Sequence, residues 1–270
     1  MALATDQLIP GEHLASERMP GHWLLARLGK KVLRPGGREL TNKLLASLEI
    51  GAGDDVVELA PGLGSTTELV LRRNPRSYTG VDREAVAAER VAKIMPGPNR
   101  KVLQASAAGT GLPEASADVV FGEAYLTMQS ALQKQRIVAE LARVARPGAR
   151  FGLHEIAFAP EDIDAERCAK VTADLAGSIH VQVAPLTLGA WRELLEAAGF
   201  EVGETFTAPL HLLEPRRLVA DEGLFGALRF ASRVARQPDA RRRVMAMRRA
   251  MRSNAANLQA CAIVATRREG

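Results

Sequence analysis

The feature that most limits what this chain can fold into is a glycine-rich turn at the end of an apolar run. The run Val56-Val57-Glu58-Leu59-Ala60 leads directly into Pro61-Gly62-Leu63-Gly64, and a segment with helical character follows. Glycine lets a ligand approach the backbone without meeting a Cβ atom, and a helix begins with unpaired N–H groups. The sequence therefore predicts a strand, a ligand-binding turn and a helix.

Short apolar runs alternate with amphipathic segments along the rest of the chain, which is typical of a mainly parallel sheet covered by helices. The predicted strands are 55–60, 77–81, 101–104, 118–122, 150–156, 201–209 and 258–266. The predicted helices are 23–32, 39–48, 65–73, 83–95, 128–145, 161–178 and 187–198, with two further helical stripes between 224 and 251. We therefore predict an α/β fold with a doubly wound, mostly parallel sheet of seven strands.

Helical segments outside the alternating pattern divide the chain into three predicted parts. Residues 1–50 are expected to form an amino-terminal helical segment that packs on the core. Residues 51–210 are expected to form the ligand-binding core, with a helical insertion near 160–183. Residues 211–270 are expected to form a second helical insertion and the final strand, and the insertions together are expected to form a cap.

The cysteines, histidines and apolar stretches indicate the cellular compartment and whether a metal site is expected. The two cysteines are far apart in the sequence and fit a reducing compartment. No stretch reaches the roughly 20 apolar residues of a membrane span, and the first twenty residues make a poor signal peptide. The histidines are isolated, without a ligand pair at helical spacing. We expect a cytoplasmic protein with no membrane span and no metal site.

An acidic residue at the end of the second predicted strand narrows the choice of ligand. Asp82 lies eighteen residues after Gly64, where a carboxylate can accept hydrogen bonds from a ribose. Thr67 stands where a dinucleotide-binding turn has its third glycine. Tyr78 and Tyr125 also lack the lysine four residues on that a common oxidoreductase uses. An NAD(P)-dependent oxidoreductase is thus an alternative and not the leading reading.

Five motifs, in order along the chain, resemble those of class I S-adenosylmethionine-dependent methyltransferases. They are the stretches 56–64, 78–82, 112–120, 141–150 and 191–200. The resemblance spans about residues 40 to 210. It implies a Rossmann-like fold, S-adenosyl-L-methionine as cofactor, and methyl transfer to an O, N or C nucleophile of a small-molecule acceptor.

The resemblance also implies which residues hold the cofactor. The expected set is Glu58, Ala60, Gly62 and Gly64 at the methionine end, Asp82 with Arg83 at the ribose, Ser106 and Ala107 at the adenine, and Glu123 after the fourth strand. Two positions depart from the family pattern. Ala60 stands at the first glycine position of the turn, and Ser106 stands where many members have an aspartate.

Candidate catalytic residues follow from where ligands bind in such a sheet. Methyl transfer from a sulfonium mainly requires alignment, and a base helps where the acceptor is a hydroxyl or an amine. Ligands bind beyond the carboxyl ends of the strands. The candidates are Glu123, Tyr125, His154 and His180. Each has a structural alternative: Glu123 could cap a helix, Tyr125 could pack, and His154 could be a hydrogen-bonded core residue.

The end of the chain is rich in arginine. From residue 215 onward there are thirteen arginines and no lysine. Such a cluster could contact nucleic acid, but few aromatic residues that could stack on bases lie nearby. A solvated helix face is the preferred interpretation. We expect a small-molecule acceptor, with a nucleic-acid methyltransferase as an alternative and homodimer formation left open.

Overall fold

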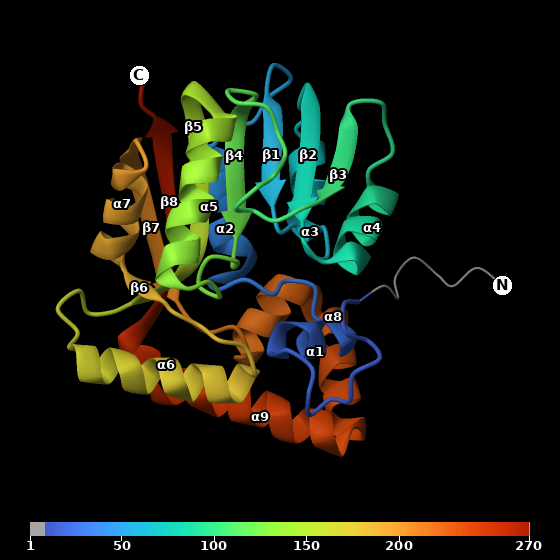
Figure 1. The fold of residues 1–270 in the computed structure, drawn as a ribbon. Helices are drawn as coiled ribbons and strands as arrows, with labels where there is room; N and C mark the ends of the chain where they lie inside the picture. The colour runs from blue at the N-terminus through green and yellow to red at the C-terminus, as the bar shows by residue number, and fades with distance from the viewer. Residues whose placement is uncertain (1–8, 270) are drawn as a thin grey trace.

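A mostly parallel sheet with helices on both faces forms the centre of the protein, whose computed structural model describes residues 9–269 (Figure 1). The first eight residues of the predicted amino-terminal segment lie outside the described residues. The strand order is β3-β2-β1-β4-β5-β8-β7, with β8 antiparallel to both neighbours. The strands are β1 (Asp55–Leu59), β2 (Ser77–Asp82), β3 (Arg100–Gln104), β4 (Ala117–Glu123), β5 (Ala145–Phe158), β6 (Leu186–Thr187), β7 (Phe200–Pro209) and β8 (Leu258–Arg267). The predicted fold is confirmed, with the two-residue β6, paired to β5, as an addition.

The helices follow the predicted order, with boundaries moved by local signals. They are α1 (Gly21–Arg27), α2 (Gly37–Ser47), α3 (Ser65–Leu71), α4 (Ala85–Ile94), α5 (Ala131–Val144), α6 (Ala165–Ile179), α7 (Leu188–Ala197), α8 (Pro215–Arg236) and α9 (Pro238–Ser253). Helix α5 begins three residues later than predicted because the Ser130 hydroxyl accepts a hydrogen bond from the Gln133 N–H. Capping thus sets the start of the helix more sharply than periodicity does.

Both faces of the sheet are buried. Helices α5 and α7 cover one face, where Leu141 and Trp191 pack on Leu59 and Phe151. Helices α2, α3 and α4 cover the other face and form a second apolar cluster. Because the central strands are covered on both sides, their sequences are nearly continuous apolar runs, and the pattern does not tell the two faces apart. The edge strands β3 and β7 are mostly half-buried or exposed.

A third apolar cluster forms a cap of α1, α6, α8 and α9. Its buried members include Leu24 of α1, Leu175 of α6, Phe230 of α8 and Met247 of α9. Figure 1 shows these helices below the sheet, at the edge toward which β1 and β4 point. The predicted amino-terminal segment is therefore divided, because α1 joins the cap while α2 packs on the sheet.

A buried ion pair fastens α8 to the segment between α1 and α2. The ammonium group of Lys30 is fully buried, 3.5 Å from an Asp221 oxygen and 3.6 Å from a Glu222 oxygen. Asp221 also accepts from the Arg38 N–H, and Glu222 accepts from the N–H groups of Lys31 and Val32. The position of this segment therefore depends on charges supplied from nearly 200 residues further along the chain.

The arginine-rich helix is not uniformly solvated. Arg243 of α9 is buried and donates to the carbonyl oxygens of Ser16, Glu17 and Met19. The predicted solvated face is therefore wrong for Arg243, which ties the amino-terminal loop to the cap. Among residues 9–269, no helix is long and apolar enough to cross a membrane.

Candidate cofactor and acceptor site

The carboxyl ends of four neighbouring parallel strands bring the predicted cofactor residues to one edge of the sheet. The Ala60 N–H donates to the Val81 carbonyl at 2.8 Å, which fixes the glycine turn beside the end of β2. The Ala105 N–H donates to the Asp82 carbonyl at 3.1 Å, which fixes the loop after β3 beside the same strand end. A ligand lying along this edge can contact the turn, Asp82 and the loop after β3 together.

The two glycines of the turn have different roles. Gly64 has a φ of +78°, a backbone conformation that residues other than glycine rarely adopt, and a Cβ atom there would lie 2.3 Å from Cδ1 of Ile94, which would have to move. A Cβ added at Gly62 would lie 3.8 Å from its nearest neighbours, leaving aside the residues directly before and after it in the chain. Gly62 also has a positive φ of +56°. Gly64 therefore packs against α4, while a Cβ at Gly62 would be in van der Waals contact with Trp23 and the Ala60 carbonyl oxygen. Contact of either glycine with the cofactor stays a prediction.

Ala60, which departs from the family pattern, occupies a conformation that glycine prefers. Its φ is +50°. Replacing an alanine at positive φ by glycine removes a steric penalty, so Ala60→Gly is expected to raise the free energy of unfolding by about 1 kcal/mol. Urea denaturation would measure this gain.

Ala139 provides the matched control for this substitution. It is exposed in the interior of α5, and glycine there should lower the free energy of unfolding by about 1 kcal/mol. An equal loss in Ala60→Gly and Ala139→Gly would show that the positive φ at position 60 carries no penalty.

Asp82 lies directly against the turn. One carboxylate oxygen accepts from the Gly62 N–H at 3.2 Å and the other accepts from the Glu84 N–H at 2.9 Å. Burial raises the pKa of Asp82, and these two hydrogen bonds oppose the rise. Each oxygen retains a lone pair, which suits a ribose diol.

The other residues expected near the ribose and adenine are more open. Arg83 is exposed and pairs with Glu84. Ser106 is exposed, and its hydroxyl accepts from the Ala108 N–H at 3.2 Å. Ala107 is half-buried. Their contact with the cofactor stays a prediction.

The Glu58 carboxylate differs from the expectation that it lines the methionine end. It is buried, and one of its oxygens accepts from the Thr67 hydroxyl at 2.8 Å and the Tyr78 hydroxyl at 2.5 Å. Burial raises the pKa of Glu58 to about 7. Glu58 therefore links α3 to β2 behind the glycine turn through hydrogen bonds. Thr67 supplies the bond from α3.

The raised pKa of Glu58 gives the stability a predictable pH dependence. Between its ordinary pKa of 4.5 and about 7, the folded protein holds a proton that the unfolded chain has released. Stability should therefore fall as the pH rises through this range, by at most about 3 kcal/mol. Glu58→Gln should remove this decline, which urea denaturation at several pH values would test. Parallel pH profiles for the variant and the wild type would contradict it.

Glu123 and His154, both predicted catalytic residues, bond to each other in the interior. One Glu123 oxygen accepts from the Thr41 hydroxyl and from His154 Nδ1, each at 2.6 Å, and the other accepts from the Thr66 hydroxyl at 2.5 Å. Burial opposes ionisation, but Arg34 and the His154 hydrogen bond outweigh it and lower the pKa of Glu123 to about 2. Glu123 is thus an anion that joins β4 to α2, α3 and β5.

The second ring nitrogen of His154 lies 2.5 Å from the Pro35 carbonyl oxygen. Because that oxygen and the Glu123 carboxylate are both acceptors, both ring nitrogens are placed to donate. The fully buried ring therefore has no free nitrogen for an acceptor molecule. The expectation that His154 acts as a base is corrected by this geometry, and the residue matches its structural alternative.

Tyr125 and His180 have different surroundings. The Tyr125 ring packs where a Cβ of Gly122 would lie, 2.4 Å from its Cε1. Its buried hydroxyl has no hydrogen-bond partner in the part of the chain that the structure describes. His180 is exposed at the end of α6, in the cap, with a φ of +56°. The structure thus separates His180 from the bonded pair Glu123 and His154.

Two residues near the site, Arg34 and Trp23, were not anticipated from the sequence. Arg34 places its Nε 3.3 Å from a Glu123 oxygen, and neither of its Nη atoms forms a hydrogen bond within residues 9–269. Trp23 of α1 has its ring 3.8 Å from the Cβ position of Gly62, and it packs against His22. Burial and, secondarily, Arg83 lower the pKa of His22 to about 4. The proline and two glycines after Arg34 are the one local signal of a special turn.

Comparisons with known proteins agree with this arrangement. The family model described as a methyltransferase domain matches residues 56–148. An uncharacterized protein of Haemophilus influenzae is 32% identical over 213 residues, which cover 77% of this chain and 83% of that protein.

Two solved structures show the same fold. A phosphoethanolamine N-methyltransferase 2 of Haemonchus contortus, in complex with phosphomonomethylethanolamine and S-adenosylhomocysteine, is 13% identical with a TM-score of 0.70, over 100% of this chain and 61% of that one. A cyclopropane synthase of Mycobacterium tuberculosis is 16% identical with a TM-score of 0.66, over 84% and 82% of the two chains.

The chain belongs to the class I S-adenosylmethionine-dependent methyltransferases. It is an enzyme with a Rossmann-like fold, and its cofactor is S-adenosyl-L-methionine. This membership sets aside the oxidoreductase alternative. Within residues 9–269, no group of three or more His, Cys, Asp or Glu side chains is arranged to hold a metal ion.

Proposed function

We propose that this enzyme transfers a methyl group to an O, N or C nucleophile of a small molecule held between the sheet edge and the helical cap. The observation that carries the proposal is the Tyr125 hydroxyl, which is buried without a partner just beyond the end of β4. An unpaired buried hydroxyl costs about 1–3 kcal/mol. An acceptor that bonds to it would be held beside the cofactor edge and beneath the cap.

The cofactor residues fit S-adenosyl-L-methionine along this edge. Gly62 presents its backbone to the ligand without a Cβ, Asp82 has free lone pairs for the ribose, and the loop with Ser106 and Ala107 follows β3 for the adenine. The free Nη atoms of Arg34 are suited to the methionine carboxylate. The bound cofactor would supply an activated methyl group, and these residues would hold it in one orientation.

Alignment, more than proton abstraction, is the chemistry that these residues support. Burial and, secondarily, Glu155 raise the pKa of Tyr125 well above its ordinary value of 10. Tyr125 is then a neutral hydrogen-bonding group that positions the acceptor. Of the two predicted histidine bases, His180 is the one whose ring forms no hydrogen bond within the described residues, so a histidine base, where the acceptor needs one, would come from the cap.

Transfer of labelled methyl from the cofactor to a fractionated cell extract tests the proposal. We expect label in the small-molecule fraction, and Tyr125→Phe should lower the rate about tenfold while leaving S-adenosylhomocysteine affinity nearly unchanged. Label confined to RNA would favour the nucleic-acid alternative. Unchanged turnover in Tyr125→Phe would remove the role of this hydroxyl.

A further inference from the structure

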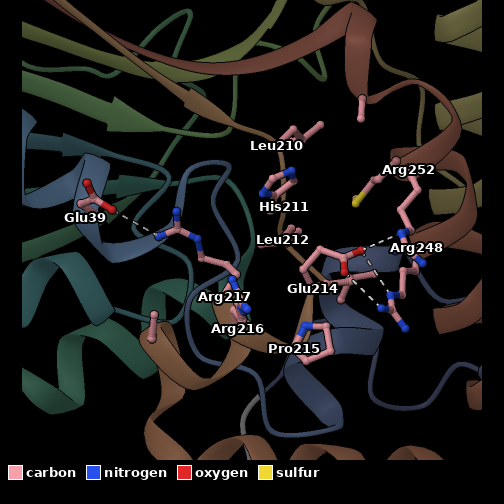
Figure 2. A pocket seen from close by; sticks show the side chains of 14 residues that line it. Glu39, Leu210, His211, Leu212, Glu214, Pro215, Arg216, Arg217, Arg248 and Arg252 are labelled. Atoms are coloured by element: carbon pink, nitrogen blue, oxygen red, sulfur yellow. Dashed lines mark hydrogen bonds and ion pairs between the residues drawn. The ribbon is translucent and has the colours of Figure 1, made fainter.

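A cavity of about 880 Å³ lies where β7 ends and α8 begins (Figure 2). Its lining comes from three parts of the chain: the segment 210–217 with Ala220 of α8, the carboxyl-terminal turns of α9 with Ala255 just after them, and Glu39 of α2. None of these residues belongs to the cofactor edge described above. The cavity is therefore lined by residues other than the predicted cofactor contacts, and its size is common for small-molecule sites, which span about 300–1,000 Å³.

Positive charge dominates the lining. Four guanidinium groups face two carboxylates, those of Glu39 and Glu214. The arginines are Arg216, Arg217, Arg248 and Arg252. Such an excess of positive charge in a concave space attracts an anion.

Glu214 holds two of the guanidinium groups at the cavity wall. Its oxygens lie 3.3 and 3.1 Å from Nε and Nη2 of Arg248, and 3.2 Å from Nε of Arg252 (Figure 2). The hydrogen bond from Arg248 is the main cause of the lowered pKa of Glu214. A guanidinium has five N–H donors, so the two bonds to Glu214 leave Arg248 with three for a ligand.

The start of α8 adds further donors. Pro215 is the first helical residue, and the Glu214 side chain does not cap the helix. The Leu218 N–H makes the first bond, to the Glu214 carbonyl, so the N–H groups of Arg216 and Arg217 have no backbone partner among the described residues. The partial positive charge of a helix start thus coincides with the arginines.

Apart from His211, the rest of the lining is apolar. Leu210, Leu212, Leu213 and Met251 are buried residues of the cap cluster that also line the cavity. We propose that the cavity binds a small amphiphilic anion, with a phosphate or carboxylate group on the arginines and an apolar chain on the leucines and methionine. This site is independent of methyl transfer, and its binding is tested without the cofactor.

Calorimetry of the full chain with octyl phosphate tests the proposal, with octanol and inorganic phosphate as the two partial ligands. We expect octyl phosphate to bind about tenfold or more tightly than either, because charged and apolar contacts combine on one molecule. Absence of octyl phosphate binding, or equal binding of octanol, would overturn the proposal.

Charge-matched variants locate the site. Arg217→Ala with Arg248→Ala should weaken octyl phosphate binding by about tenfold or more. Arg241→Ala with Arg249→Ala removes two exposed arginines of α9 that do not line the cavity, and this double variant should leave binding unchanged. Equal weakening in both double variants would show a general charge effect and would refute the site.

A substitution that tightens binding tests the site in a second way, because a variant that failed to fold could not bind more tightly. Glu214→Gln removes the carboxylate that occupies Arg248 and Arg252, so it should tighten octyl phosphate binding severalfold. Affinity for S-adenosylhomocysteine reports whether each variant retains the fold. Weaker octyl phosphate binding in a folded Glu214→Gln variant would contradict the proposed arrangement.

Discussion

Asp82→Ala is expected to weaken the binding of S-adenosylhomocysteine by about 100-fold, because two hydrogen bonds to a buried carboxylate together contribute about 3 kcal/mol. The wild-type carboxylate lies against the glycine turn, where it accepts from the Gly62 N–H. The substitution removes the predicted ribose acceptor and also one fixed point of the turn. Isothermal titration calorimetry would measure the change.

Two further variants separate recognition of the ribose from general effects of charge. Asp82→Asn keeps one carbonyl oxygen, so we expect an intermediate loss of about tenfold. Glu84→Ala removes a neighbouring carboxylate that pairs with exposed Arg83 and not with the turn. Its affinity should stay within about twofold of the wild type. Unchanged affinity in Asp82→Ala would show that the ribose lies elsewhere.

The sheet and the cofactor edge were predictable because the signals that define them are local. The glycine turn follows β1 directly, and Asp82 follows β2, so parallel strands alone place them side by side. The direction in which the Glu58 side chain points was harder to predict from the sequence. Side chains alternate along a strand, so Val57 and Leu59 on one face put Glu58 on the other. Since both faces are apolar, the sequence did not say which face the cofactor approaches.

The contacts that the sequence did not reveal join distant parts of the chain. Arg34 meets Glu123 from 89 positions away, and no pattern near either residue indicates the other. Arg243 lies 227 positions from its partner Ser16. Helical spacing puts Val244, Met247 and Met251 on one face of a helix, and that face of α9 is buried. It could not show that a loop from the opposite end of the chain covers the neighbouring arginine.

Asp221→Asn is expected to lower the free energy of unfolding by about 3 kcal/mol, because it leaves a buried ammonium group short of a counter-charge. The Lys30 side chain has no solvent exposure, and burial lowers its pKa, which Asp221 and Glu222 oppose. Asparagine keeps the shape and still offers an oxygen to the Arg38 N–H. The loss would therefore come from the charge, and urea denaturation would measure it.

A double-mutant cycle decides whether the pair acts through charge. In Lys30→Met with Asp221→Asn, the ammonium group and the Asp221 charge are both gone, so part of the loss should be regained, because uncharged side chains of similar volume can replace a buried ion pair at little cost. Glu222 keeps its charge and its two backbone donors. Lys30→Met alone should be destabilising, since it leaves Asp221 and Glu222 without their cation. If the two single losses simply add in the double variant, the pair is not coupled. In that case α8 would be held to residues 30–38 by the hydrogen bonds that the Lys31 and Val32 N–H groups donate to Glu222.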